Sequence, residues 1–246
     1  MSFRVEIAGR FAREAAALGE GEVCARFRRS FYLRYPGERH ACLGDASLGR
    51  GPLNALLSEL VLPALGEKIS VAMDSSVPWE PPRRAPVSPP PELLKAARIP
   101  TEGLGCLATG AHNALTVYAQ PALEALQHWL AGNALGAEAE LLIGLGPGLT
   151  PSGDDYLGGM LVALRLLGRG AQADALWRWI EPRLTQRTSA ISAAHLAAAA
   201  SGQAHEALHE VLGGSPDLER LNAVGHCSGW DGLAGAVAVI ESYGRN

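Results

Sequence analysis

The chain has 246 residues, 48% of them hydrophobic, and a formal net charge of −4 at pH 7. This length and apolar content suffice for one large globular domain or two of ordinary size. The negative charge, with only 21 Lys and Arg residues, excludes a global basic field for nucleic acid. No apolar run is long enough to span a bilayer and the first residues lack a signal-peptide core, so we expect a cytoplasmic protein without membrane contact. The four cysteines form no Cys-x-x-Cys pair and no zinc-ligand spacing, which is typical of reduced thiols.

The first 77 residues have the alternating pattern of β-strands. Apolar and polar residues alternate over 31–35, Pro36-Gly37-Glu38 follows as a turn, and 41–43 resemble a returning strand. A second alternation covers 69–73. The sequence therefore predicts a hairpin within a small β-rich domain over residues 1–77, with one or two short helices.

Prolines separate this region from the rest of the chain. Half of the residues between Pro78 and Pro91 are proline, which favours an extended linker over residues 78–91. Beyond it, apolar residues recur at three and four positions, so residues 92–246 are predicted to be mostly α-helical. The expected fold class is α+β. Expected helices cover 91–97, 111–118, 121–131, 153–167, 171–187, 189–200, 205–212 and 229–243.

One pattern occurs twice in the helical part. Ser152-Gly153-Asp154-Asp155-Tyr156-Leu157-Gly158-Gly159 and Ser228-Gly229-Trp230-Asp231-Gly232-Leu233-Ala234-Gly235 share Ser, Gly, Asp, Leu and Gly in register. Each start is followed by an apolar stripe of helical spacing, and small residues would let the two helices approach closely. The repetition predicts two helix starts of one design that converge.

These starts allow two interpretations. Ser as N-cap with Asp three residues later is a capping box, which stabilises many helices that have no function. The functional interpretation is an anion-binding pocket, because a helix N-terminus offers free N–H groups and the positive end of its dipole. The glycine-rich approach 144–148 favours the second, since glycine lets backbone N–H groups come close to a ligand.

The acidic residues and one histidine of the starts are candidates for chemistry. Carboxylates repel a bare anion unless they cap a helix, bind a cation or act as acid or base. Asp154 and Asp155 suit an Mg²⁺ ion that bridges to a phosphate. His226 suits either a general acid or base beside Ser228 or a simple hydrogen bond at the helix junction.

Two nucleotide-binding motifs fail. A dinucleotide fingerprint would need glycine at 149, where this chain has Leu, and a βαβ context. A Walker A loop would need a lysine, and none occurs from 142 to 160.

The segments Gly144–Asp155 and Gly225–Asp231 resemble the AllH-like family, some members of which are subunits of oxamate carbamoyltransferase. Gly49–Asn54 and Thr188–Ser192 extend the resemblance over most of the chain, and Cys227 stands where the family pattern has Thr. The resemblance implies transfer of a carbamoyl group between carbamoyl phosphate and an amide such as oxamate, within a complex of unlike subunits. It also implies a small anionic substrate, namely carbamoyl phosphate, oxamate or phosphate.

Backbone N–H groups at helix starts can stabilise both a phosphate and a tetrahedral oxyanion, so the residue pattern is compatible with this chemistry. On this basis His226 and Asp154 are the catalytic candidates, and Asp154 and Asp155 the metal candidates. The expected binding residues are Gly146, Gly148, Thr150, Ser152, Gly153, Asp155, Ser228, Gly229 and Asp231. Two alternatives stay open: a non-catalytic partner subunit whose helix starts are structural, and an Mg²⁺-dependent phosphate hydrolase.

Overall fold

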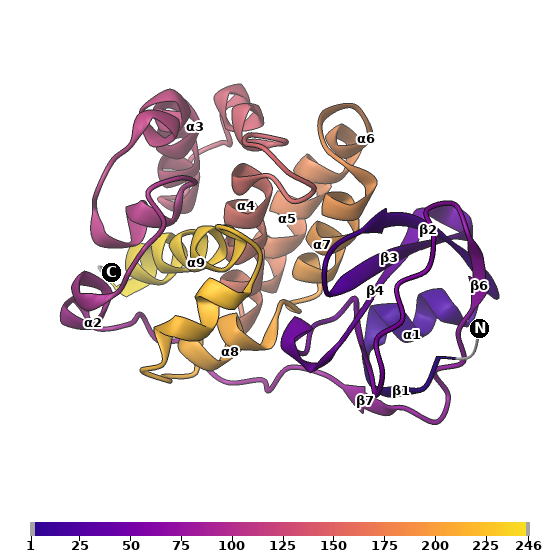
Figure 1. Cartoon of the computed structure of the whole chain (residues 1–246). Helices are drawn as coiled ribbons and strands as arrows, with labels where there is room; N and C mark the ends of the chain where they lie inside the picture. The colour runs from indigo at the N-terminus through magenta and orange to yellow at the C-terminus, as the bar shows by residue number, and fades with distance from the viewer. Residues whose placement is uncertain (1–2, 245–246) are drawn as a thin grey trace. The chain divides into compact units, whose positions relative to one another are not determined.

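The protein is described by a computed structural model over residues 3–244, and the chain divides into two compact units after Pro82 (Figure 1). The N-terminal unit is a seven-stranded sheet with one α-helix. The C-terminal unit is helical. The fold is therefore α+β, as the sequence predicts.

The sheet of the N-terminal unit mixes antiparallel and parallel pairs. Its strand order is β6-β2-β3-β4-β5-β1-β7. Neighbours pair antiparallel except β4 with β5 and β1 with β7. The strands are β1 (Val5–Gly9), β2 (Glu20–Arg26), β3 (Ser30–Tyr35), β4 (Arg39–Gly44), β5 (Asn54–Leu57), β6 (Lys68–Ser70) and β7 (Val77–Trp79), and α1 spans Arg10–Ala16.

The predicted hairpin is formed by β3 and β4. Its turn, Pro36–Glu38, has positive φ at Gly37 (72°) and Glu38 (54°), which reverses the chain directly after β3. Phe31 and Leu33 on β3 are fully buried, because the alternation turns one face of the strand into the core.

The proline-rich segment begins with a strand rather than with linker. β7 contains Pro78, which aligns with Ala8 of β1 in a parallel pair. This is tolerated because β7 is the edge strand of the sheet, where a missing N–H breaks no second ladder.

The helical unit is built around α4 and α9, which lie side by side in Figure 1. Its α-helices are α2 (Pro91–Ala96), α3 (Ala114–Leu130), α4 (Ser152–Leu166), α5 (Gly170–Ile180), α6 (Leu184–Arg187), α7 (Ala190–Ala200), α8 (Glu206–Leu212) and α9 (Ser228–Gly244). Short 3-10 turns lie at η3 (Gly105–Thr109), η4 (Ala137–Leu142), η5 (Glu181–Arg183) and η6 (Leu218–Ala223). The predicted apolar stripes of α4 and α9 face the core: Leu157, Leu161 and Leu233 are fully buried, and Ile240 at the end of the α9 stripe is partly buried.

Two prolines act differently from the prediction. The sequence predicts two helices on either side of Pro121, but α3 continues through this residue. Because proline has no N–H, the carbonyl of Val117, four residues earlier, loses its helical hydrogen bond. Both residues lie on the exposed face of the helix. Pro182 has the opposite effect. It breaks the single helix expected over 171–187 into α5, η5 and α6.

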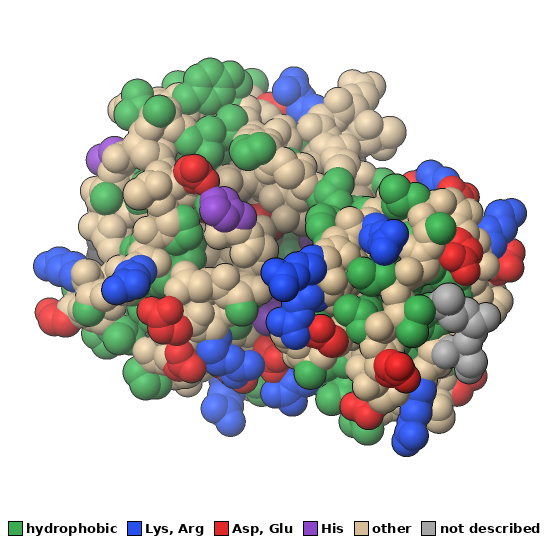
Figure 2. Space-filling view, in the orientation of Figure 1, with side chains coloured by type: hydrophobic (Ala, Val, Ile, Leu, Met, Phe, Trp, Pro, Cys, Tyr) green, Lys and Arg blue, Asp and Glu red, His purple; other side chains and the backbone are tan. Residues whose placement is uncertain are grey.

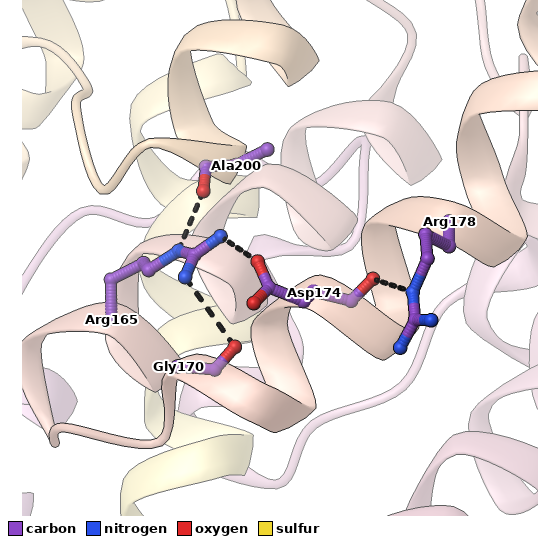
Figure 3. Close-up of polar contacts among 5 residues, drawn as sticks. All are labelled: Arg165, Gly170, Asp174, Arg178 and Ala200. Carbon is purple, nitrogen blue, oxygen red and sulfur yellow. Dashed lines mark hydrogen bonds and ion pairs between the residues drawn. The ribbon is translucent and has the colours of Figure 1, made fainter.

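An arginine holds the C-terminal end of α4 against its neighbours (Figure 3). Arg165 donates from Nε to the carbonyl of Ala200 at 2.6 Å and from Nη1 to that of Gly170 at 3.4 Å. It also pairs with Asp174 of α5 at 2.5 Å. Arg165 thus fixes the C-terminal end of α4 to α5 and α7.

None of the helices within residues 3–244 is both long and apolar enough to cross a membrane. On the face shown in Figure 2, acidic and basic side chains are interspersed.

Candidate functional site

The starts of α4 and α9 converge because glycine lets the two helices touch. A Cβ atom on Gly159 of α4 would lie 1.8 Å from the carbonyl oxygen of Gly232 of α9. A Cβ atom on Gly235 would lie 1.9 Å from the carbonyl oxygen of Tyr156. Real Cβ atoms cannot come so close, so glycine is required at both crossing points. The predicted close approach is confirmed.

The two contacts are related by the same 76-residue offset as the sequence repeat. Gly159 corresponds to Gly235, and Tyr156 corresponds to Gly232. The contact between Gly159 of α4 and Gly232 of α9 is therefore repeated, with the two helices exchanged, by Gly235 and Tyr156. The residues before the helices follow the same relation, since the carbonyls of Pro151 and Cys227 each accept two amide N–H groups of the following first turn. The repeat therefore builds a locally two-fold arrangement.

The expected capping box is not formed at α4. Pro151 is the N-cap and no side chain caps the helix, because Ser152 already lies inside the first turn. The Ser and Asp side chains interact across the pair instead. The Ser152 hydroxyl of α4 lowers the pKa of the Asp231 carboxyl of α9, and the Ser228 hydroxyl of α9 lowers that of Asp155 of α4, so each serine faces the acid of the other helix. The repeated residues link the two helices rather than stabilise each one separately.

Asp231 lies at the centre of this arrangement and is fully buried. Its Oδ1 accepts the Leu104 N–H at 2.6 Å, while its Oδ2 has no partner among the described residues. Burial raises the pKa of Asp231 to about 6, although hydrogen bonds from Ser152 and the amides of Leu104 and Gly105 lower it. The carboxyl therefore titrates close to neutral pH.

Asp155 is the counterpart of Asp231. The residue is partly exposed, yet its Oδ2 is buried and has no partner among the residues described. Burial raises the pKa of Asp155 well above its usual value, and the charges of Asp231 and Asp154 raise it further. Ser228 and Thr150 act in the opposite direction by hydrogen bonding, and their hydroxyl oxygens lie 3.1 Å apart.

Asp154 points to a different set of partners. Its Oδ1 accepts the Gly144 N–H at 2.8 Å, and its Oδ2 accepts the hydroxyls of Ser192, at 2.7 Å, and Thr188. Burial raises its pKa. With both oxygens engaged, Asp154 ties the glycine-rich segment 144–148 to the start of α7.

The segment 144–148 has the backbone shape that its glycines predict. Gly144, Gly146 and Gly148 all have positive φ. A side chain at Gly144 would collide with the backbone at Arg187, whereas a Cβ atom on Gly148 would meet no atom within 4 Å. The loop is thus packed at one end and open at the other.

Two of the amides expected to hold an anion are already bonded. The Gly153 N–H donates to the Leu145 carbonyl at 2.9 Å, and the Gly229 N–H donates to that of Val224 at 3.2 Å. Both glycines instead give room for the preceding turn, since a Cβ atom would lie 2.0 Å and 2.4 Å from backbone oxygens.

His226 lies at the exposed edge of the site. Its Nε2 is 2.6 Å from Oε2 of Glu102, and the two side chains are 80% and 72% exposed. Sequence reasoning missed Glu102 and the segment 103–105 that covers Asp231. No local signal marks residues that reach the site from more than 120 positions away in the chain.

The fold and this site define an α+β protein whose helical unit carries two Ser-Gly-x-Asp helix starts in contact with each other. One carboxyl oxygen of Asp155 and one of Asp231 have no partner within the part of the chain that the structure describes. Residues 142–240 match the family model described as oxamate carbamoyltransferase subunit AllH. The match includes both helix starts and the glycine-rich approach, so the resemblance seen in the sequence is confirmed for this segment. No solved structure matches the chain significantly.

Proposed function

We propose that the protein is a subunit of an oxamate carbamoyltransferase-type enzyme and that the paired starts of α4 and α9 bind its small substrates. One observation carries the proposal: the buried Oδ2 atoms of Asp155 and Asp231 have no partner among the described residues. Buried polar atoms are nearly always hydrogen-bonded, and leaving one unpaired costs about 1–3 kcal/mol. A ligand that supplies N–H donors would remove this cost.

Amide substrates supply such donors. Oxamate and the carbamoyl group each carry an NH₂, which can donate to carboxylate oxygens. Phosphate at neutral pH offers few donors and would be repelled by two carboxylates. We therefore assign the amide ends to Asp155 and Asp231, and the anionic ends to the N–H groups of Ser152 and Ser228 and the open side of the loop at Gly146 and Gly148.

Carbamoyl transfer also needs a proton acceptor. The oxamate nitrogen forms a bond to the carbamoyl carbon, loses a proton, and phosphate leaves with the electrons of the broken C–O bond. Asp231, with its pKa near 6, is ionised at neutral pH and suits this role. His226 faces Glu102 at the exposed edge, and Asp154 has both oxygens occupied. We assign Asp154 a positioning role and leave His226 at the margin of the site.

The family name describes a subunit, and we propose that other subunits complete the active enzyme. The chain tested alone is then expected to bind substrate without turning it over. A non-catalytic subunit whose helix starts are structural predicts no binding at all.

The test compares oxamate with oxalate, which has the same size and an anionic end but no N–H donor. Oxamate should stabilise the folded protein by about 2.7 kcal/mol at 100 times its dissociation constant, and oxalate by much less. Asp231→Asn and Asp155→Asn should lose this preference, whereas Asp74→Asn, at an exposed position in the N-terminal unit, should keep it.

If oxamate, carbamoyl phosphate and phosphate all leave the melting temperature unchanged, the binding proposal is wrong. If the Asp231 and Asp155 variants support full activity in the assembled enzyme, the subunit is not catalytic. A melting shift that requires Mg²⁺ and phosphate together would favour the hydrolase instead.

A further inference from the structure

We propose that Glu102, His226 and Cys227 form a binding site for one divalent transition-metal ion of the zinc class. The three residues offer one carboxylate oxygen, one imidazole nitrogen and one thiol sulfur, and these ligand atoms all lie within 4.8 Å of one another. This inference does not rest on the proposed function, because it concerns different side chains at the edge of the α9 start.

The donor set selects the class of metal. Zinc and its close analogues take Cys, His and carboxylate ligands in a tetrahedral shell, whereas Mg²⁺ and Ca²⁺ require oxygen ligands. Three protein ligands leave a fourth position for water or substrate, which is the arrangement of catalytic rather than structural zinc sites. The exposure of Glu102 and His226 lets an ion enter from solvent.

The backbone around the ligands is already fixed. Gly103 has φ of 78°, and a Cβ atom there would lie 3.0 Å from the Cβ of Cys227. The next residue, Leu104, donates its N–H to Asp231, whose own N–H donates to the Cys227 carbonyl at 2.9 Å. The backbone next to Glu102 and the backbone at Cys227 are thus joined through one buried carboxyl group, which places the two residues close together.

The electrostatic surroundings favour a cation. The carboxyl groups of Glu102 and Asp231 both lie near the Cys227 side chain. Their negative charge attracts a divalent ion. When the ion binds, the thiol proton passes to solvent and the thiolate sulfur bonds to the metal.

Co²⁺ is the probe, because its bond to a thiolate gives a charge-transfer band in the near ultraviolet. Metal-free, tag-free, full-length protein is titrated with Co²⁺, and the band should saturate at one ion per chain. Cys227→Ser should abolish the band, and His226→Ala should weaken binding by at least about tenfold. Cys24→Ser is the matched control and should leave the band unchanged, since Cys24 is also partly exposed but lies in the N-terminal unit.

Addition of Zn²⁺ should displace the bound Co²⁺ and remove the band. Absence of the band in the unmodified protein overturns the proposal, and so does a band that survives Cys227→Ser or disappears in Cys24→Ser. Neither result bears on oxamate binding, so this site and the proposed function fail separately.

Discussion

Asp231→Asn tests whether the folded protein holds a carboxylate whose ionised form is destabilised by burial. The substitution keeps an oxygen that accepts the Leu104 N–H, and it replaces the unpartnered Oδ2 by an NH₂ group. The folded-state pKa of about 6, against 3.8 for an ordinary Asp, means that the ionised form is destabilised by about 3 kcal/mol. Above pH 7 the variant should therefore be more stable than the unmodified protein by up to about 3 kcal/mol.

The direction of the pKa shift determines how the stability difference between the two proteins changes with pH. Because the pKa of Asp231 is higher in the folded than in the unfolded state, the folded state binds more protons between pH 4 and pH 6. The unmodified protein thus gains stability from Asp231 as the pH falls through this window, and the variant does not. The advantage of the variant should shrink from about 3 kcal/mol at pH 8 to about half of that at pH 5.

Urea unfolding of both proteins at pH 8 and pH 5, with a chelator present, measures the difference. Contributions from other titrating groups cancel in the comparison of the two proteins. A variant that is less stable at pH 8, or a difference that does not change with pH, would refute the assignment of a destabilised carboxylate to this position. Such a carboxylate would be consistent with stability given up for function.

Three further predictions concern the surroundings of the site. Gly159→Ala should destabilise the protein by at least about 3 kcal/mol, because the new Cβ atom would collide with a carbonyl oxygen. Gly158→Ala should be neutral or stabilising by up to about 1 kcal/mol, since its Cβ atom would lie 3.7 Å from its nearest neighbour. Thermal unfolding of the two variants compares them. Burial lowers the pKa of His209 to about 4, so the folded state takes up a proton there less readily than the unfolded state. The free energy of unfolding should therefore fall by up to about 3 kcal/mol between pH 6.5 and pH 4. His209→Gln should remove this pH dependence when unfolding is followed in acid titrations. Ser192→Ala removes one donor from Asp154 and should cost about 1–3 kcal/mol in urea unfolding, with a result below 0.5 kcal/mol, about the size of a surface substitution, contradicting the hydrogen bond.

The sequence predicts the individual helices and strands of this fold better than it predicts which elements lie next to one another. The hairpin of β3 and β4 and the helices α4, α7, α8 and α9 follow from local periodicity and turn residues, which are encoded in adjacent positions. The sheet order is different, since nothing local states that β5 lies between β4 and β1. The continuation of α3 through Pro121 depends on which face of the helix meets solvent, and that is settled by packing.

The candidate site shows the same limit. The repeated Ser-Gly-x-Asp pattern relates Ser152 to Ser228 and Asp155 to Asp231, but capping rules assign each serine to the Asp of its own helix. In the structure each serine faces the acid of the other helix, which requires the two helices to touch at glycines. Only the packing of the two helices determines this contact. Glu102 has no signal in the sequence, because its neighbours there carry no motif and its partner His226 is remote.

The central claim is that the two helix starts jointly hold an amide substrate. Amide-resolved NMR of the full-length protein during an oxamate titration tests it most directly. We predict that the N–H signals of Ser152 and Ser228 move together, with one dissociation constant, while those around Arg165 at the far end of α4 stay in place. Signals that move at only one of the two starts, or at neither while oxamate binds elsewhere, would contradict the claim.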